Sequence, residues 1–288
     1  MRVLIIGTGL MGSSIATCLS RKQFKVIAYN RTSSKAVELC GRIGCEAVTS
    51  LEGVNADYTV VSLFDDYANL EVLVRGRVYE KVKTGYLVNT STISPQTSLL
   101  IASTLIEHGV RYLEGTVFGS VDEATDCRLV SMVGGNREWF NTLEHFISEY
   151  SSKVVYAGEI PSATALKLAV NNIALSLPAL IGESLSILEA YNVDVSKLLE
   201  VADATWIKQI FDRYWSRISE EKKARFTVAG VAKDFKLISN ELHTKGYPGV
   251  VASGVASYYS GLLERMSLKD YPQAALGYLR KWKKLSDY

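Results

Sequence analysis

Short apolar runs alternate with helix-like segments along the first half of the chain. Segments such as Ser34–Ile43 and Thr97–Glu107, which lie between the runs, carry apolar residues at helical spacing. This alternation predicts an α/β Rossmann domain built on a doubly wound parallel sheet. The expected strands are Val3–Ile6, Lys25–Tyr29, Tyr58–Leu63, Tyr86–Asn89, Tyr112–Val117, Leu129–Val133 and Val154–Ala157.

The pattern changes after Gly158. Residues 162–191 read as one helix of about thirty residues, which at ~1.5 Å per residue would span roughly 45 Å. Pro178 lies inside it and would leave the carbonyl of Ala174 without a helical partner, so we expect a kink there. The rest of the chain has only helical patterns. We therefore predict two domains: a dinucleotide-binding Rossmann domain at 1–160 and an all-α C-terminal domain at 161–288.

The first strand runs into three spaced glycines, Gly7, Gly9 and Gly12. In a dinucleotide-binding turn the first glycine permits the tight turn, and the second lets the backbone approach a pyrophosphate. The third permits close packing of helix and strand. The following helix would begin at Leu10 and Met11, with its amides and positive end facing the phosphates. A purely structural glycine turn is the alternative.

The end of the second expected strand points to the cofactor. An acidic residue there would bind a ribose hydroxyl and repel a phosphate, but the chain has Asn30, Arg31 and Thr32. A fixed positive charge beside hydroxyl donors favours the 2′-phosphate of NADP over NAD. The alternative is that Arg31 is a solvated loop arginine. Leu63 and Phe64, where the third expected strand ends, are further candidate cofactor contacts.

Residues 89–95, Asn-Thr-Ser-Thr-Ile-Ser-Pro, directly follow another expected strand. Ligands of doubly wound sheets bind at the carboxyl ends of the strands. Ser94 and Pro95 read as a helix cap and first helical residue. Ser91 and Thr92 remain as candidate contacts to substrate and cofactor.

Lys167 and Asn171 lie four residues apart, on one face of the long helix. Their neighbours are small or apolar, and burial among such residues favours an uncharged amine. Such a lysine can donate a proton to a carbonyl oxygen and take it back in the reverse reaction, with Asn171 orienting it. A solvent-facing lysine is the ordinary alternative.

A third candidate position is the adjacent pair Lys233 and Asp234. Neighbouring residues on a helix point in different directions. Lys233 is therefore a candidate for contact with a cofactor or substrate charge, while Asp234 anchors the helix. A surface lysine is again the alternative.

Composition narrows the function classes. The chain has 288 residues, 48% hydrophobic and 22% charged, with a net charge of +2, which is typical of a soluble globular protein without a nucleic-acid surface. No apolar run suggests a membrane span, and the first residues read as a strand rather than a signal peptide. The four cysteines lack metal-ligand spacing, so we expect no metal site, reduced thiols and a cytoplasmic protein.

These motifs, in this order, resemble the β-hydroxyacid dehydrogenase family, which includes 3-hydroxyisobutyrate dehydrogenase and 6-phosphogluconate dehydrogenase. Residues 7–12, GTGLMG, are similar to the glycine turn of the family. Asn30-Arg31-Thr32 is similar to the NRT sequence of those members that use NADP. The resemblance implies that Lys167 is the catalytic lysine, with Asn171 one turn later and Ser91 contacting substrate. It also implies that Lys233 lies near cofactor and substrate, that Lys269-Asp270-Tyr271 is the closing element of the C-terminal domain, and that this domain closes over substrate and builds a homodimer.

Two departures from the family bear on the substrate. The family binds the substrate carboxylate with a serine and glycine amides, at positions that here carry Phe118, Gly119 and Ser120. Glycines shortly before the catalytic lysine are here Pro161 and Ala163. Both changes suggest an altered pocket.

We therefore expect an NADP-dependent oxidoreductase acting on a small β-hydroxyacid or semialdehyde. One alternative is an enzyme resembling the imine reductases, a related group that also lacks the serine motif. Those enzymes usually have another residue in place of the lysine, whereas this chain keeps Lys167. The other is a catalytically silent NADPH-binding redox sensor.

Overall fold

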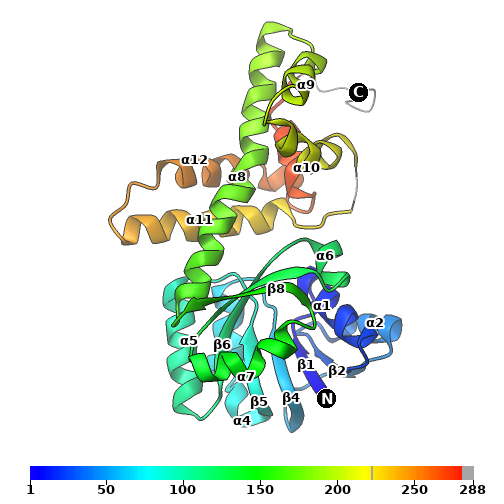
Figure 1. Ribbon diagram of the computed structural model, residues 1–288, viewed down its shortest axis with the longest axis vertical. Coiled ribbons are helices and arrows are strands. Elements are labelled where there is room, and N and C mark those ends of the chain that lie inside the picture. The colour runs from blue at the N-terminus through cyan, green and yellow to red at the C-terminus, as the bar shows by residue number, and fades with distance from the viewer. Residues whose placement is uncertain (222, 281–288) are drawn as a thin grey trace. The chain divides into compact units, whose positions relative to one another are not determined.

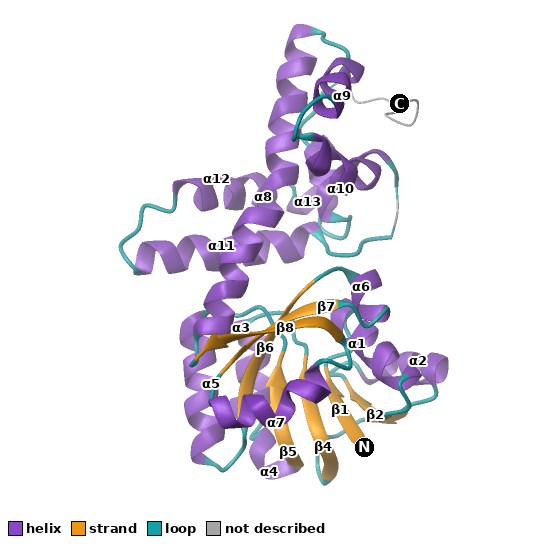
Figure 2. Cartoon of the chain, in the orientation of Figure 1, coloured by secondary structure: helices purple, strands orange, loops and turns teal. Residues whose placement is uncertain are grey.

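The computed structural model describes residues 1–221 and 223–280. Its N-terminal half contains one eight-stranded sheet with the order β3-β2-β1-β4-β5-β6-β7-β8 (Figure 2). All seven expected strands are present, with ends that differ by a few residues. The strands are β1 (Arg2–Ile6), β2 (Lys25–Tyr29), β3 (Glu46–Val48), β4 (Val54–Val61), β5 (Val82–Asn89), β6 (Tyr112–Phe118), β7 (Leu129–Gly134) and β8 (Ser151–Gly158).

The sheet departs from the sequence expectation in two ways. The short edge strand β3 pairs with β2 and was not expected. In addition, β7 runs antiparallel to β6, whereas a wholly parallel sheet was expected. The strands from β3 to β6 are parallel to one another, so their carboxyl ends lie along a single edge of the sheet.

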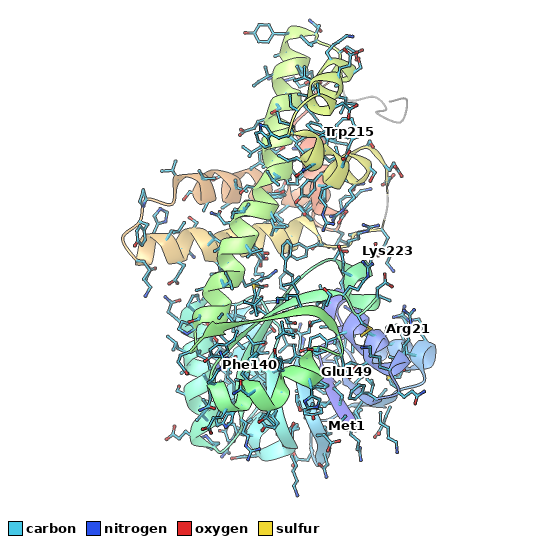
Figure 3. All side chains as sticks on the ribbon, in the orientation of Figure 1. Met1, Arg21, Phe140, Glu149, Trp215 and Lys223 are labelled. Atoms are coloured by element: carbon cyan, nitrogen blue, oxygen red, sulfur yellow. A yellow bond between two sulfur atoms is a disulfide. The ribbon has the colours of Figure 1, made fainter. Side chains whose placement is uncertain are left out.

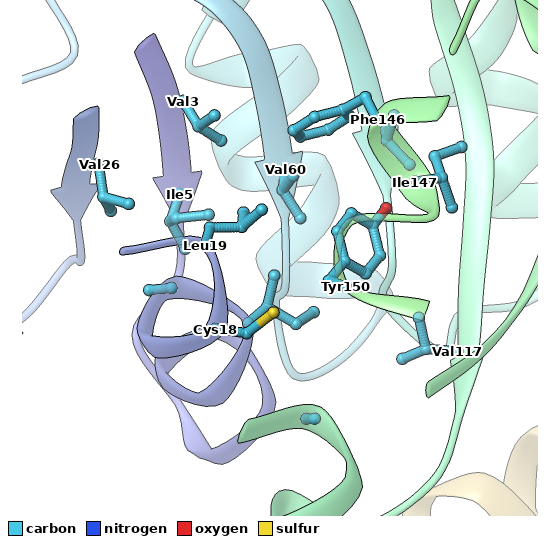
Figure 4. Packing of buried hydrophobic residues seen from close by; sticks show 14 of the residues in the cluster. Val3, Ile5, Cys18, Leu19, Val26, Val60, Val117, Phe146, Ile147 and Tyr150 are labelled. Atoms are coloured by element: carbon cyan, nitrogen blue, oxygen red, sulfur yellow. The ribbon is translucent and has the colours of Figure 1, made fainter. Parts of the chain in front are cut away.

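Alternate residues of β1 enter two separate apolar clusters. Val3 and Ile5 pack on the face covered by α1 (Leu10–Arg21), α2 (Ser33–Ile43) and α7 (Arg137–Ile147), as Figure 4 shows for part of this cluster. Leu4 and Ile6 pack on the opposite face with residues of α5 (Pro95–Glu107). Burial of both faces explains why β1 is a continuous apolar run instead of an alternating one.

Short helical segments complete the connections of this half, and longer helices form the rest of the chain (Figure 1). The short segments are α3 (Asp66–Asn69), the π-helix η1 (Leu70–Arg75), α4 (Val78–Lys81) and α6 (Val121–Thr125). The later elements are α8 (Ser162–Tyr191), α9 (Val195–Asp203), α10 (Lys208–Ser219), α11 (Val228–Thr244), α12 (Val250–Ser260), α13 (Leu263–Met266) and the 3₁₀-helix η2 (Tyr271–Leu276).

Helix α8 continues through Pro178. The carbonyl of Ala174, which Pro178 deprives of a helical N–H, accepts a hydrogen bond of 2.8 Å from the Tyr214 hydroxyl on α10. The neighbouring carbonyl of Leu175 accepts one of 3.0 Å from Tyr259 on α12. The Tyr214 hydroxyl thus takes the place of the missing helical partner of Ala174. Burial raises the pKa of Tyr259 well above its usual range, which keeps its hydroxyl a donor to Leu175.

The chain divides into two compact units, Met1–Leu168 and the residues from Ala169 onward. This division lies inside α8, eight residues after the boundary at 160 that the change of pattern suggested. The first unit holds the sheet, and the second is helical, as the sequence indicates. Lys167 belongs to the first unit and Asn171 to the second.

The structure contradicts the expectation of reduced thiols. Cys18 on α1 is bonded to Cys127, just after α6, and Cys40 on α2 is bonded to Cys45 (Figure 3). The spacing of four cysteines cannot reveal pairs that the fold brings together, since four cysteines allow three connectivities. The argument from free thiols for a cytoplasmic location falls with this finding.

One helix of the described residues, α8, is long and apolar enough to cross a membrane by length and composition alone. The sequence reading found no such run, so that expectation needs correction. In the structure the middle of α8 packs against other helices and receives the two tyrosine hydroxyls at its backbone.

Candidate functional site

The glycine turn after β1 has a separate steric role for each glycine. Gly7 has a φ of +100°, and a Cβ there would overlap the carbonyl oxygen of Ser62. A Cβ on Gly12 would overlap the carbonyl oxygen of Gly7, so α1 packs against the turn only because Gly12 has no side chain. By contrast, no atom beyond Gly9 and its two chain neighbours lies within 4 Å of the Cβ position of Gly9. Open space at Gly9 is what a close-approaching ligand requires.

Helix α1 begins at Leu10 and Met11, directly after Gly9, and no side chain caps its N-terminus. The first amides of a helix have no intrahelical acceptor and carry a partial positive charge. A diphosphate beside Gly9 would supply that acceptor. The residues of the turn therefore fit a bound dinucleotide.

Asn30, at the end of β2, ties the glycine turn to the next loop. Its side-chain oxygen accepts from the Thr8 amide at 3.1 Å, and its amide nitrogen donates to the Thr32 carbonyl at 3.0 Å. Arg31 and Thr32 are exposed, and among the described residues the Arg31 guanidinium has no hydrogen bond or ion pair. The structure thus gives Asn30 a role in shaping the loop and presents the charge of Arg31 to solvent.

The carboxyl ends of β4 and β5 are held together by Ser91. Its hydroxyl oxygen accepts from the Leu63 amide at 2.9 Å, and its own amide donates to the Asn89 side chain at 3.0 Å. Ser91 is buried, Thr92 is half-buried, and Phe64 is exposed. Ser91 therefore positions the backbone of Leu63, a role that the sequence did not indicate.

One further prediction about this loop can be compared with the structure. Ser94 accepts from the Thr97 amide at 3.2 Å and caps α5, which confirms its assignment as a cap. Asn89 also donates to the hydroxyl of Tyr112 at 3.3 Å. Complete burial raises the pKa of Tyr112, so its phenol stays neutral inside the sheet.

The end of β6 places an aromatic ring beside the candidate catalytic lysine. The Lys167 ammonium lies 5.4 Å from the centre of the Phe118 ring, and only 9% of Lys167 is exposed. This position excludes the ordinary alternative of a solvent-facing lysine. The attraction of a cation to a ring face favours the charged amine, whereas burial opposes it.

The two residues after Phe118 form the start of α6. Gly119 has a φ of +142°, and a side chain there would approach Leu129. The amide and hydroxyl of Ser120 both donate to the Glu123 carboxylate in a capping box. Both donors of Ser120 are thus engaged within α6, and the loop beside Lys167 presents mainly the Phe118 ring.

In the helical unit, Asn171 and Lys233 meet at a third residue. The Asn171 side-chain nitrogen donates to Asp234 at 2.7 Å, and the Lys233 ammonium lies 2.6 Å from the other oxygen of the same carboxylate. Asn171 and Asp234 are 2% and 1% exposed. The sequence reading assigned Asp234 only to anchoring its helix. Its bond to Asn171, 63 residues away, ties α11 to α8 at the candidate site.

The Rossmann unit also contains a carboxylate to which the sequence analysis gave no role. Glu114 on β6 is 1% exposed and accepts hydrogen bonds from the first turn of α8. Ala163, one of the two departures before Lys167, is fully buried in that turn. Among residues 1–221 and 223–280 no cluster of histidine, cysteine or carboxylate side chains is placed to hold a metal ion.

Comparison with known proteins agrees with this geometry. The sequence profile of the NAD binding domain of 6-phosphogluconate dehydrogenase matches residues 2–158. Glyoxylate/succinic semialdehyde reductase 1 of Arabidopsis thaliana is 30% identical over 207 residues, which cover 70% of this chain and 71% of that protein. The chain belongs to the β-hydroxyacid dehydrogenase family. As a member of that family it is an oxidoreductase that uses a nicotinamide cofactor.

Solved structures of the β-hydroxyacid dehydrogenase fold extend the likeness over both units. The 3-hydroxyisobutyrate dehydrogenase of Mycobacterium tuberculosis has a TM-score of 0.78 at 18% identity, covering 96% of this chain and 98% of that one. An imine reductase from Myxococcus stipitatus has a TM-score of 0.63 at 17% identity, covering 96% and 99%. At these identities the likeness concerns the fold, which both kinds of enzyme share.

Proposed function

We propose that this protein is an NADP-dependent reductase of small aldehyde or keto substrates, and the dehydrogenase of the corresponding hydroxyacids, with Lys167 as general acid and base. The observation that carries the proposal is the burial of Lys167 against Phe118, which is unusual for a lysine without a function. A bound nicotinamide would supply or accept the hydride. The chain's own residues then handle the proton.

Lys167 is the group that we assign to proton transfer. In reduction its ammonium donates a proton to the carbonyl oxygen, and in oxidation the neutral amine takes the hydroxyl proton. The Phe118 ring stabilises the ammonium form that reduction requires, while burial eases the loss of its charge. One turn later on α8, Asn171 is fixed by donating to Asp234.

The preference for NADP rests on the end of β2. Asn30, Arg31 and Thr32 occupy the loop where an acidic residue would repel a phosphate, and the Arg31 guanidinium is exposed. Replacing Arg31→Ala should raise the KM for NADPH about tenfold to a hundredfold and leave the KM for NADH within twofold, because a charge-assisted bond is lost. Arg42→Ala, an exposed arginine at the other end of α2, is the control. Equal effects on both cofactors would contradict the assignment.

The role of Lys167 is tested by Lys167→Ala with the exposed Lys153→Ala as control. Turnover should fall by about 10²–10⁴-fold, as expected for loss of a general acid. NADPH affinity, measured by fluorescence titration, should stay within twofold. Unchanged turnover would exclude Lys167 as the acid. Substrates for the assay are glyoxylate, succinic semialdehyde, methylmalonate semialdehyde and a cyclic imine.

The same panel separates the alternatives. Activity on the cyclic imine alone would favour an imine reductase, a possibility supported by Phe118 beside the lysine. Tight NADPH binding without turnover of any substrate would favour a redox sensor. Against a sensor stands the paired burial of Lys167 and Asn171, since binding of the nucleotide alone needs neither.

We also propose that the helical unit forms a homodimer. Helix α8 exposes Ile173, Leu180, Ile187 and Tyr191, between 52% and 79% each. A monomer rarely exposes such a row on one helix. Light scattering of the purified protein should give twice the chain mass of 31.7 kDa, and a monomeric mass at micromolar concentration would contradict the proposal.

A further inference from the structure

The Glu114 carboxylate lies at the start of the helix that carries Lys167. One of its oxygens accepts from the hydroxyls of Ser98 and Thr164, both at 2.5 Å. The other accepts from the backbone amides of Ala163 and Thr164, at 2.9 and 3.3 Å. All of these donors are neutral, and Glu114 is 1% exposed.

The two amides belong to the first turn of α8, where backbone N–H groups have no intrahelical acceptor. A carboxylate from β6 therefore does for α8 what a capping side chain does for other helices, and it meets the positive end of the helix. The partial charge of that end, together with two hydroxyls, replaces the cation that a buried carboxylate ordinarily requires.

Three alternate residues of β6 follow the first turns of α8. Glu114 binds the amides of Ala163 and Thr164, and the Thr116 hydroxyl donates to the Ala163 carbonyl at 3.1 Å. Phe118 meets Lys167. Residues two apart on a strand share a face, so one face of β6 guides α8 from its first turn to the lysine.

Two further features fix the position of the Glu114 carboxylate: the space left by Gly134 and a hydrogen bond to α5. A Cβ on Gly134 of β7 would overlap the Glu114 carboxylate and press on Ala163, so Gly134 leaves the space that both occupy. Through Ser98 the carboxylate also reaches α5, the helix that follows the loop of Ser91 and Thr92. Glu114 thus joins the strand of Phe118, helix α5 and the helix of Lys167.

We propose that Glu114 is a positioning residue. By holding the first turn of α8, it sets the position and orientation of the Lys167 amine. This inference rests on the proposed role of Lys167. Loss of the hydrogen bonds between Glu114 and the first turn of α8 should displace the amine. A shift of about 1 Å at a reacting group can cost about 10²-fold in rate. Cofactor affinity should not change, because the glycine turn makes no contact with Glu114.

The test compares two variants. Glu114→Ala removes the hydrogen bonds of the carboxylate, whereas Glu114→Gln keeps a hydrogen-bonding side chain without the charge. The glutamine amide can donate to the Ser98 and Thr164 hydroxyls, which rotate to accept, while its oxygen keeps the two backbone amides. We expect kcat to fall by about 10–100-fold in the alanine variant and to return to within about threefold in the glutamine variant. KM for NADPH should stay within twofold in both. Ser131→Ala, which breaks a buried hydroxyl pair elsewhere in the sheet, is the control for stability alone.

A second variant covers the case in which Glu114→Ala does not fold. Thr164→Val removes only one hydroxyl donor and should lower kcat about threefold to tenfold, whereas Thr164→Ser should not. Wild-type kcat in Glu114→Ala or in Thr164→Val would overturn the inference, as would a glutamine variant as slow as the alanine variant. If Lys167→Ala itself keeps full turnover, the proposed function fails first. If Lys167→Ala is inactive and the Glu114 variants are not, only this inference fails.

Discussion

Each of the two units contains a buried carboxylate with four hydrogen-bonded contacts, but the donors differ. Glu114 in the Rossmann unit accepts from two hydroxyls and two helix amides. Asp270 in the helical unit accepts from the Nε and Nη2 of Arg217 at 2.8 and 3.0 Å, and from the amides of Arg225 and Phe226. Neutral donors alone bind Glu114, whereas the charged guanidinium of Arg217 binds Asp270.

This difference predicts how each carboxylate tolerates substitution. Neutral hydroxyls can reverse their bonds and accept from an amide, so Glu114 has a nearly isosteric neutral replacement. A guanidinium only donates, and removing its carboxylate leaves a buried charge. Only 8% and 3% of the Arg217 and Asp270 side chains are exposed. The helical unit therefore depends on its ion pair, whereas the Rossmann unit depends on hydrogen-bond geometry.

The largest effect is expected for Arg217→Ala. It leaves Asp270 charged and buried with only two amide donors, which should lower the free energy of unfolding by about 3–5 kcal/mol. Urea denaturation followed by circular dichroism measures the change. The exposed Arg265→Ala should stay within about 0.5 kcal/mol.

A double variant sharpens this result. Replacing Arg217 and Asp270 together by leucine removes both charges and should cost less than Arg217→Ala alone. A larger loss in the double variant would mean that packing of the two side chains, rather than their charges, holds the unit together.

A smaller effect is expected for Glu114→Gln. Since every donor keeps an acceptor, unfolding should become easier by about 1 kcal/mol or less. The same urea experiment measures it. A loss of 3 kcal/mol or more would place Glu114 in the same class as Asp270 and remove the contrast.

The smallest effect concerns the exposed pair of Lys269 and Glu221 beside the buried one. The hydrogen bond and charge of Lys269 lower the pKa of Glu221 below its usual value. A lowered carboxyl pKa contributes stability above the ordinary value near 4.5 that is lost as the pH falls through the folded-state pKa. Because both side chains are exposed, Glu221→Gln should change the melting temperature at pH 7 by less than the scatter of repeats. A clear shift that 0.5 M salt does not reduce would contradict this.

The pattern of apolar residues along the chain was enough to predict most strands and the long helix α8. The apolar runs located seven strands, and the missing β3 has only three residues at the edge of the sheet. The length of α8 and the carbonyl freed by Pro178 also followed from the sequence. The strand direction of β7 did not, because it depends on the path of the connection rather than on composition.

The candidate site divides in the same way. Gly7 and Gly12 have the steric roles that their spacing indicated, and the Cβ position of Gly9 is open. The contacts that were missed join residues distant in sequence: Glu114 binds the first turn of α8, 49 and 50 residues later, and Asp234 binds Asn171 across 63 residues. No periodicity reports such a contact. The one available signal was a carboxylate inside an otherwise apolar strand, which in a folded protein must have donors.

The Cys18–Cys127 bond encloses a sequence separation of 109 residues, which includes every element from β2 to α6. A protease that cuts any exposed loop within this stretch would not release a fragment. The pieces would migrate as one band in a denaturing gel until a reductant parts them. The Rossmann unit can therefore be nicked and remain one covalent molecule.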